Sequence, residues 1–198
     1  MKNLYSDDAF TGLEAAIVLI AFVVVAAVFS YVVLGAGFFT SQTAQATVHT
    51  GVSQASSSME LVGNIYGIKG TGNFLAYTNV TVALTAGGTP IDLSQMVVSY
   101  NDDQGGHNAN LTYEVGAACT NALAGTNAGA AQSWCIAQHI GGTTALLGNN
   151  EQMIITVGLP PTASPNTKIT INFQPAVGAV LPISRTVPGG LTVVQPLY

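Results

Sequence analysis

One stretch decides the fold of the N-terminal part, DDAFTGLEAAIVLIAFVVVAAVFSYVVLGAGFF (residues 7–39). After Glu14 the chain has no Asp, Glu, Lys or Arg before Glu60. As an α-helix, the uncharged run from Ala15 to Phe39 would be roughly 37 Å long, against about 30 Å for the hydrocarbon core of a bilayer. The run is longer than the apolar part of a secretory signal peptide, and its head is acidic rather than basic. The stretch therefore predicts a helix of membrane-spanning length and disfavours an ordinary signal peptide.

Helical spacing continues into the next segment, TSQTAQATVHTGVSQASSSMELVG (residues 40–63). Its apolar residues recur every three or four positions, which predicts one apolar stripe on a helix. These residues are Ala44, Val48, Val52, Ala55, Met59 and Val62. We expect a single helix from about Thr11 to Val62, with Gly63 as its C-cap.

From residue 73 onward the apolar pattern has a period of two, which is typical of strands with one buried face. The alternating residues are Val80, Val82 and Leu84, then Met153, Ile155 and Val157, then Ile169, Ile171 and Phe173. Further strands are expected within residues 91–100, 110–115, 133–140 and 180–187. About seven short strands between Gly, Pro and Asn turns predict an antiparallel β-sandwich of the immunoglobulin-like kind. The expected fold class is α+β, a helix of about 50 residues followed by this sandwich.

The composition argues against a nucleic-acid-binding protein and favours an exported one. Only 7% of the 198 residues are charged, where about 25% is usual, and the net charge is −5. The four basic residues, Lys2, Lys69, Lys168 and Arg185, are scattered singly, so they form no patch that could bind nucleic acid. Low charge with many Gly, Ser, Thr and Asn residues indicates an exported or surface polypeptide.

The two cysteines agree with an oxidising compartment. Cys119 and Cys135 are separated by a Gly/Ala/Asn-rich segment, and no His or third Cys has the spacing of a zinc site. A disulfide between them, which would contribute about 3 kcal/mol in the chain-entropy model, is favoured over two buried thiols.

The position of Glu14 has a local explanation. Thr11 and Glu14 fit the S/T-x-x-E capping box, in which Thr11 caps the helix and Glu14 reaches back to the Thr11 amide. A carboxylate in the first turn also suits the helix dipole, by about 0.3–1 kcal/mol.

A resemblance supplies a second explanation. Residues 9–39 resemble the class III signal and N-terminal helix of type IV pilin-like proteins, with small Ala9 before the cleavage point, Phe10 after it and Glu14 five positions into the mature chain. Within that superfamily, the apolar helix, the Ser/Thr/Gln segment and the β-rich remainder resemble an archaeal flagellin, or archaellin. The resemblance implies a leader peptide at 1–9, removed by a prepilin peptidase, a polymerisation helix at 10–63 and an outer domain at 64–198.

By the same resemblance, Glu14 would pair with the α-amino group of a neighbouring subunit, a role compatible with capping. The implied protein is the structural subunit of the archaellum filament, a homopolymer or a copolymer with sibling archaellins. It would lie in the cytoplasmic membrane until an assembly motor extracts it to the cell surface for swimming. An archaeal adhesion pilin is the alternative, and a membrane-anchored binding protein or enzyme is a third class. We expect no catalytic residues, no cofactor and no metal.

Candidate surface sites follow from short motifs. Asn79-Val80-Thr81 and Asn110-Leu111-Thr112 are N-glycosylation sequons, which suit a charge-poor surface protein. Oxygen-bearing side chains near a Gly-Gly turn offer ligands for Ca²⁺, although their spacing lacks the EF-hand pattern and a solvated turn explains them as well. These residues are Asn101, Asp102, Asp103 and Glu114.

Overall fold

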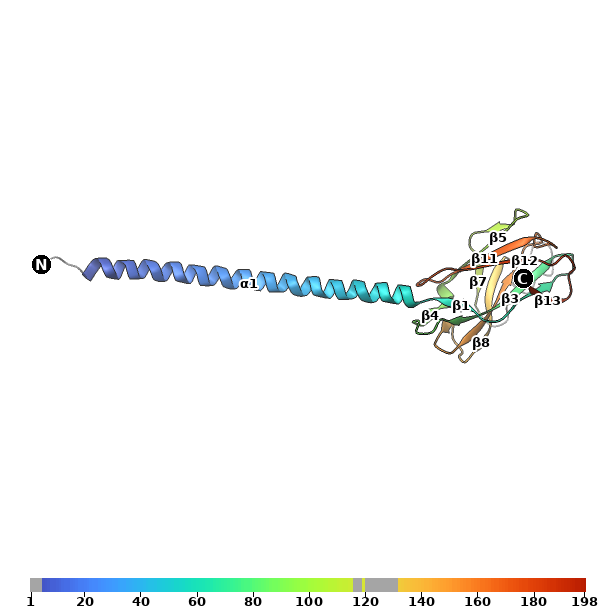
Figure 1. Cartoon of the computed structure of the whole chain (residues 1–198), viewed down its shortest axis with the longest axis horizontal. Coiled ribbons are helices and arrows are strands. Elements are labelled where there is room, and N and C mark those ends of the chain that lie inside the picture. Colours follow the sequence, from blue (N-terminus) through green and yellow to red (C-terminus); the bar gives the residue numbers. More distant parts are fainter. Residues whose placement is uncertain (1–4, 116–118, 120–131) are drawn as a thin grey trace. The chain divides into compact units, whose positions relative to one another are not determined.

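A computed structural model describes the backbone of residues 5–115, 119 and 132–198, and within these ranges the side chains from residue 12 onward. The chain forms two compact units that divide between Thr50 and Gly51. The first unit consists of one helix, α1 (Tyr5–Ser56), whose last residues belong to the second unit (Figure 1). The expected long N-terminal helix is therefore present.

The second unit is built from short strands. In chain order they are β1 (Met59–Leu61), β2 (Ile65–Lys69), β3 (Leu75–Leu84), β4 (Ile91–Asp92), β5 (Val97–Asp102), β6 (His107–Asn108), β7 (Thr112–Glu114), β8 (Ser133–Ile140), β9 (Leu146–Leu147), β10 (Gln152–Gly158), β11 (Lys168–Gln174), β12 (Leu181–Thr186) and β13 (Val194–Leu197). A single 3₁₀ turn, Leu93–Gln95, separates β4 from β5.

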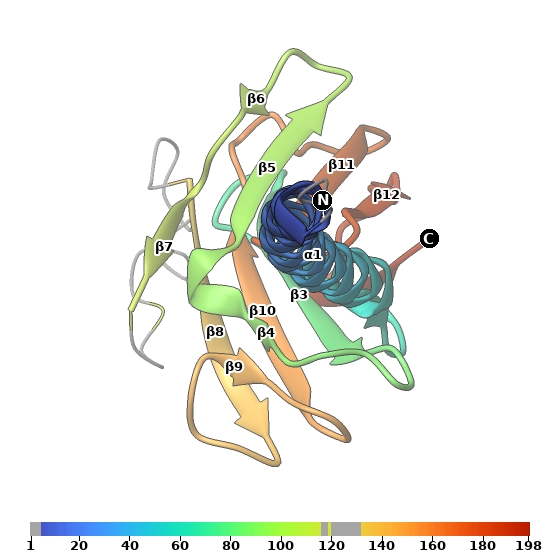
Figure 2. The same cartoon turned by 90° about the vertical axis from the view of Figure 1, so that its left-hand side faces the viewer.

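These strands form two main sheets. The larger has the order β13-β2-β3-β10-β8-β7, with β1 also pairing to β3, and the smaller has the order β12-β11-β5-β6. Figure 2 shows β3, β10 and β8 side by side, and β5 next to β11. The strand pairs are antiparallel except β7 with β8, which is parallel, and β4 pairs with β9 in a small third sheet.

The alternating residues of the two main sheets meet in one hydrophobic core. Val80, Val82 and Ile155 come from the larger sheet, and Ile171 and Phe173 from the smaller, and each is at most 1% exposed. Trp134 of β8 lies in the same core, and its ring centroid is 4.5 Å from that of Tyr113. The expected sandwich is confirmed, because the period-two pattern places one face of each strand between the sheets.

The end of α1 differs from the sequence prediction. The helix ends at Ser56, so the expectation that it continues to Val62 with Gly63 as C-cap is wrong. Met59 belongs to β1, pairs with Leu84 and is 5% exposed in the core. The spacing of Ala55, Met59 and Val62 fits a helix, but ladder bonds and core burial stabilise the strand more. Gly63 has φ +72° and interrupts the pairing to β3 between β1 and β2.

The segment after α1 is held by two loops, residues 85–89 and 175–179, which we call the collar. Ser57 is 1% exposed, its carbonyl oxygen accepts a hydrogen bond from the Ala179 amide at 3.2 Å, and its hydroxyl contacts that of Thr89. The Ser58 carbonyl accepts bonds from the Thr85 amide and hydroxyl, both at 3.0 Å. These contacts fix the point at which the chain changes from helix to strand.

The start of α1 also precedes the predicted one. The backbone is already helical from Tyr5, so Thr11 does not occupy the first turn in the chain that includes residues 5–10. Ala9 and Phe10 lie within α1, but their side chains are outside the described residues. Capping by Thr11 and cleavage between Ala9 and Phe10 stay predictions for the processed chain.

Candidate functional site

The exposed surface of α1 is the main candidate for a functional site. Every residue from Gly12 to Thr50 is exposed, and the helix from Gly12 to Ser56 is long and apolar enough to cross a membrane. The exposed fractions of Phe22, Phe29 and Phe39 are 72%, 69% and 71%. Such a surface lies against something other than water.

The free energy of exposing these apolar side chains to water shows that the surface of α1 needs a cover. Seventeen large apolar side chains between Leu13 and Phe39 are exposed. At about 1.5–3 kcal/mol for each side chain, leaving them in water costs roughly 25–50 kcal/mol. A whole domain is stable by only about 5–15 kcal/mol. The apolar residues surround the helix instead of forming one face, so the cover must also come from all sides.

Small residues interrupt this surface and permit close approach. A Cβ atom added at Gly12, Gly35, Gly37 or Gly51 would meet nothing within 4 Å. Glu14 lies at a shallow groove that Ala15, Val18, Leu19 and Phe22 also line. A second groove is lined by Val24, Val25, Val28, Phe29 and Val32. Grooves and open glycines of this kind let helices pack with short interaxial distances.

A set of threonines in the second half of α1 was missed by the sequence reasoning. The hydroxyls of Thr40, Thr43, Thr47 and Thr50 each donate to the carbonyl oxygen four residues earlier, at 2.8, 2.9, 2.9 and 2.9 Å. Their spacing of three, four and three residues is visible in the sequence and would have identified them. Because the helix itself satisfies these donors, this segment carries fewer free polar groups than its composition indicates.

The two predicted glycosylation sites differ in their surroundings. Asn110 is exposed in the turn between β6 and β7, where its backbone N–H donates to Asn108 Oδ1 at 3.0 Å. Asn79 is half-buried in β3, which is paired on both sides, and its Oδ1 accepts a bond from Thr156 Oγ1 at 2.9 Å. The side chain of Asn110 is therefore the more accessible of the two predicted glycosylation sites.

The predicted disulfide between Cys119 and Cys135 is present, with Cα atoms 5.5 Å apart. It packs with Ala137 in a small cluster separate from the main core. Cys135 lies opposite Thr156 in the β8–β10 pairing and next to Trp134, which points into the core instead. The disulfide thus ties Cys119 to the face of β8 opposite Trp134.

The acidic residues near the Gly-Gly turn organise that turn. Asp102 Oδ1 accepts bonds from the amides of Gln104 and Gly106, at 3.0 and 2.6 Å, and Oδ2 accepts from the hydroxyls of Tyr100, at 2.7 Å, and Thr162. Burial alone would raise the pKa of Asp102, but these hydrogen bonds outweigh it and hold the pKa below its ordinary value. Burial, with the Asp102 bond, raises the pKa of Tyr100. Protein donors thus occupy Asp102, one of the four residues considered for Ca²⁺. The described residues contain no group of three or more His, Cys, Asp or Glu side chains placed to hold a metal.

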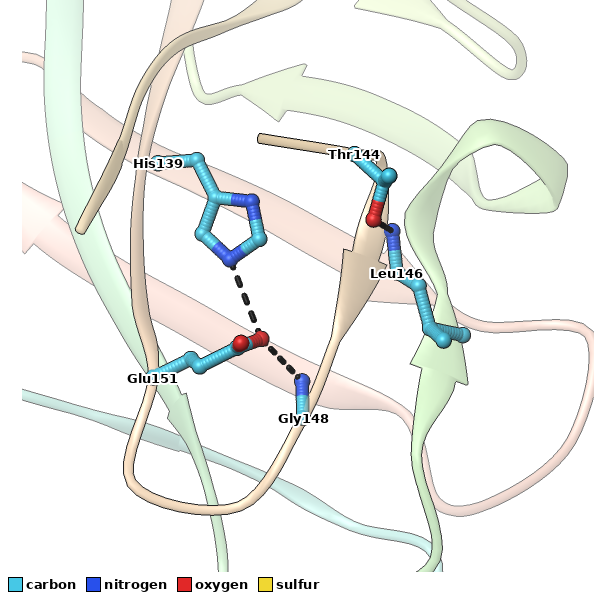
Figure 3. Close-up of polar contacts among 5 residues, drawn as sticks. All are labelled: His139, Thr144, Leu146, Gly148 and Glu151. Atoms are coloured by element: carbon cyan, nitrogen blue, oxygen red, sulfur yellow. Dashed lines mark hydrogen bonds and ion pairs between the residues drawn. The ribbon is translucent and has the colours of Figure 1, made fainter. Parts of the chain in front are cut away.

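A polar contact between His139 and Glu151 joins two ends of a loop in the second unit. Glu151 Oε2 accepts a bond from the Gly148 amide at 2.7 Å and lies 3.1 Å from His139 Nε2 (Figure 3). The Gly148 bond, followed by the contact with His139, holds the pKa of Glu151 below its ordinary value. In the same loop, the backbone amide of Leu146 donates a hydrogen bond of 3.3 Å to the hydroxyl oxygen of Thr144. This pair ties β8 to the start of β10 and has the geometry of a structural contact.

The chain is similar in sequence to known flagellins. The chain is 41% identical over 194 residues to "Probable flagellin 1" of Archaeoglobus fulgidus, which covers 95% of this chain and 94% of the relative. A stretch of 32 residues is 88% identical to the "24 kDa flagellin" of Methanospirillum hungatei and spans 16% of this chain and all of that sequence.

Two solved structures of archaeal flagellins are similar to this chain. The archaeal flagellum of Methanospirillum hungatei strain JF1 matches with a TM-score of 0.68 at 30% identity, over 94% of this chain and 98% of that one. The flagellin FlaB1 of Methanocaldococcus jannaschii has the same fold, with a TM-score of 0.57 at 19% identity over 71% of this chain and 96% of that one. The sequence pattern of the archaeal-type flagellin family matches residues 9–185. The chain therefore belongs to the archaeal-type flagellin family.

Proposed function

We propose that this chain is the structural subunit of an archaellum filament, which it forms by packing α1 against α1 of other copies. The observation that carries the proposal is the fully exposed apolar surface between Leu13 and Phe39. Family membership and the match to a flagellum subunit over 94% of the chain support it. The filament would lie outside the cell and serve swimming, and the role of the chain in it is structural.

Before assembly, lipid would cover the same surface. The apolar helix is longer than the roughly 30 Å hydrocarbon layer, so it spans a membrane without help from other chains. Assembly then exchanges lipid contacts for protein contacts. Contacts between unlike surfaces of successive subunits leave both ends open, so they extend into a helical polymer instead of closing. Sibling flagellins with the same helix would be able to enter this polymer.

We further propose that a prepilin peptidase cuts between Ala9 and Phe10 and that an assembly motor extracts the processed chain. The new α-amino group of Phe10 would then serve as the cationic partner of Glu14 in a neighbouring subunit. A carboxylate without a partner among apolar helices costs several kcal/mol, so Glu14 selects the register in which a cation reaches it. Glycans on Asn110, and on Asn79 if its side chain turns outward, would hydrate the charge-poor outer domain.

The test of the assembly surface compares two substitutions in cells whose own copy is deleted. Val25→Lys places a charge within the apolar part of α1, whereas Val193→Lys places the same charge on the second unit, where Val193 is 75% exposed. We expect cells with Val25→Lys to lack filaments under negative-stain microscopy and to stop swimming, while Val193→Lys cells keep both. Immunoblots of the membrane fraction establish that each variant is made and inserted. Normal filaments with Val25→Lys would exclude α1 as the packing surface.

A further inference from the structure

The face of the larger sheet that points away from the core carries apolar side chains near one sequon. Val80 of β3 lies in the core, so its neighbour Asn79 points to the opposite face of the sheet. Residues directly opposite one another on β13, β2 and β3 share that face. We call its apolar side chains at this edge of the sheet the tyrosine shelf, which consists of Tyr66, Ile68, Tyr77, Val194 and Pro196.

The tyrosine shelf is only partly covered. Tyr66 is 44% exposed and Val194 is 57% exposed, and the other three members are half-buried. None of the five side chains carries a charge. A single exposed apolar side chain is ordinary, but adjacent ones on one face of a sheet favour a bound group that shields them from water.

Asn79 lies at the border of the shelf. It is directly opposite Tyr66 in the β2–β3 pairing, where Cβ atoms are typically about 4.5–5.5 Å apart. Tyr77 is two residues earlier in β3 and therefore points to the same face. The first sugar of a glycan on Asn79 would thus start next to both tyrosine side chains.

The amide of Asn79 is held in an orientation that suits this attachment. Its Oδ1 atom accepts a hydrogen bond of 2.9 Å from the hydroxyl of Thr156, which lies on the β10 side of β3. The oxygen and the nitrogen of an amide point in different directions, so this bond turns Nδ2 away from β10. Nδ2 is the atom to which an N-linked glycan is attached, and β2 with Tyr66 lies on the other side of β3.

The pairing of β3 also fixes the order of events. Asn79 is half-buried in a strand that pairs with β2 on one side and with β10 on the other. A glycosylating enzyme has to reach Nδ2, so the sugar would be attached before these strands pair. Folding of the sheet then brings Tyr66 to a sugar that is already present.

A sugar has the chemistry that the shelf requires. One side of a pyranose ring presents C–H groups that pack on the face of an aromatic ring, while its hydroxyls stay in contact with water. Because the glycan is covalently tethered, this contact costs no translational freedom, unlike the binding of a separate partner. A weak contact with one tyrosine ring is therefore enough to hold the sugar in place.

We propose that Asn79 carries a glycan whose first sugar lies on the tyrosine shelf against Tyr66 and so becomes part of the folded second unit. This inference rests on the proposed function, which includes glycans on the outer domain, and adds the surface that one of them covers. Under the remaining explanation, Asn79 is unmodified or its glycan extends into water, and Tyr66 keeps the exposure that it has in the bare chain.

Oxidation by hydroxyl radicals, read out by peptide mass spectrometry, distinguishes these explanations. The full chain is taken from cells in detergent, and the peptide containing Asn79 first shows whether that residue is modified. Thr81→Val destroys the sequon but keeps Asn79 and a side-chain shape that suits a strand. Asn110→Gln is the matched control, because it destroys the sequon in the turn between β6 and β7.

We expect Tyr66 to be oxidised at least about twofold faster in Thr81→Val than in the unsubstituted chain, since a sugar on one face of the ring covers about half of it. Asn110→Gln should leave the rate at Tyr66 unchanged, and Tyr198, which is 80% exposed, should react equally in all three chains. Equal rates at Tyr66 in Thr81→Val and the unsubstituted chain would overturn the inference, as would an unmodified Asn79 peptide. Absence of filaments from cells with the unsubstituted chain would instead overturn the proposed function, so the two failures are distinguishable.

The unsubstituted chain alone keeps the inference testable if Thr81→Val does not fold. Tyr66 and Tyr198 are 44% and 80% exposed in the bare chain, so without a cover Tyr66 should react at about half the rate of Tyr198. With a sugar on one face of its ring, the ratio should fall to about a quarter or less. A ratio of about half in a chain with modified Asn79 would show that the glycan does not lie on Tyr66.

Discussion

Gly178, in the collar, is the glycine at which one added methyl group should lower the free energy of unfolding most. Its φ is +117°, a conformation that costs an L-residue about 1–3 kcal/mol. A Cβ atom there would lie 1.8 Å from the carbonyl oxygen of Ser57, so the backbone has to move. That movement costs about 1–3 kcal/mol and also breaks the bond from Ala179 N to Ser57 O, worth about 1 kcal/mol. We therefore expect Gly178→Ala to lower the free energy of unfolding by at least about 3 kcal/mol.

The assay is thermal unfolding of the full chain in detergent. Trp134 is the single tryptophan and is completely buried in the β core, so its fluorescence follows the second unit alone. A loss of about 3 kcal/mol corresponds to a fall in Tm of at least about 6 °C for a unit of this size. Far-UV circular dichroism follows the helix of α1 in the same samples.

Gly190→Ala is the matched control. A Cβ atom at Gly190 meets nothing within 4 Å, and Gly190 is not among the glycines with positive φ. We expect its free energy of unfolding to stay within about 0.5 kcal/mol of the original. If the Tm values of Gly178→Ala and Gly190→Ala both lay within about 2 °C of that of the unsubstituted chain, the collar would not hold Ser57 as described.

Three further predictions concern the second unit. Because hydrogen bonds lower the pKa of folded Asp102, its charged form adds stability that is complete above the ordinary pKa of about 3.9 and is lost as the pH falls through the lower folded value. Asp102→Asn should therefore lower Tm at pH 7 and weaken the fall of Tm below about pH 4; an unchanged acid profile would contradict this. Replacing Cys119 and Cys135 with Ser should lower the free energy of unfolding by about 3 kcal/mol in denaturant titrations, and adding a reductant to the original chain should give the same value. Asn110→Gln should remove one glycan from the intact mass of sheared filaments, and an unchanged mass would rule out modification there.

The sequence predicted the elements whose pattern is strong and local. The alternation around Val80, Ile155 and Ile171 identified β3, β10 and β11, because each strand buries one face in the core. β2 was missed, since Gly67 interrupts its pattern. The structure explains that glycine, because a Cβ atom there would come within 3.0 Å of Leu75 and 3.1 Å of Leu197.

Other features depended on contacts between distant parts of the chain. The end of α1 was placed too late because Met59 has helical spacing, and only its pairing to Leu84 across the sheet reveals a strand. Similarly, the contact between His139 and Glu151 follows from the pairing of β8 with β10, which the sequence does not specify. The apolar helix and the disulfide were predictable because both depend on residues within one segment. The spacing of Thr40, Thr43, Thr47 and Thr50 was equally visible, but only the structure shows that their hydroxyls bond to the preceding turn.

The absence of Asp, Glu, Lys and Arg from Ala15 to Met59 has a consequence for how the stability of a filament depends on salt concentration. Dissolved salt weakens attractions between charges beyond about 8 Å at physiological ionic strength, but it does not weaken contacts between hydrocarbon side chains. If this segment forms the axis of a filament, as proposed, we expect that axis neither to loosen in concentrated salt nor to dissociate on dilution. Detergent, which competes for contacts with hydrocarbon, is the agent expected to dissolve such a filament.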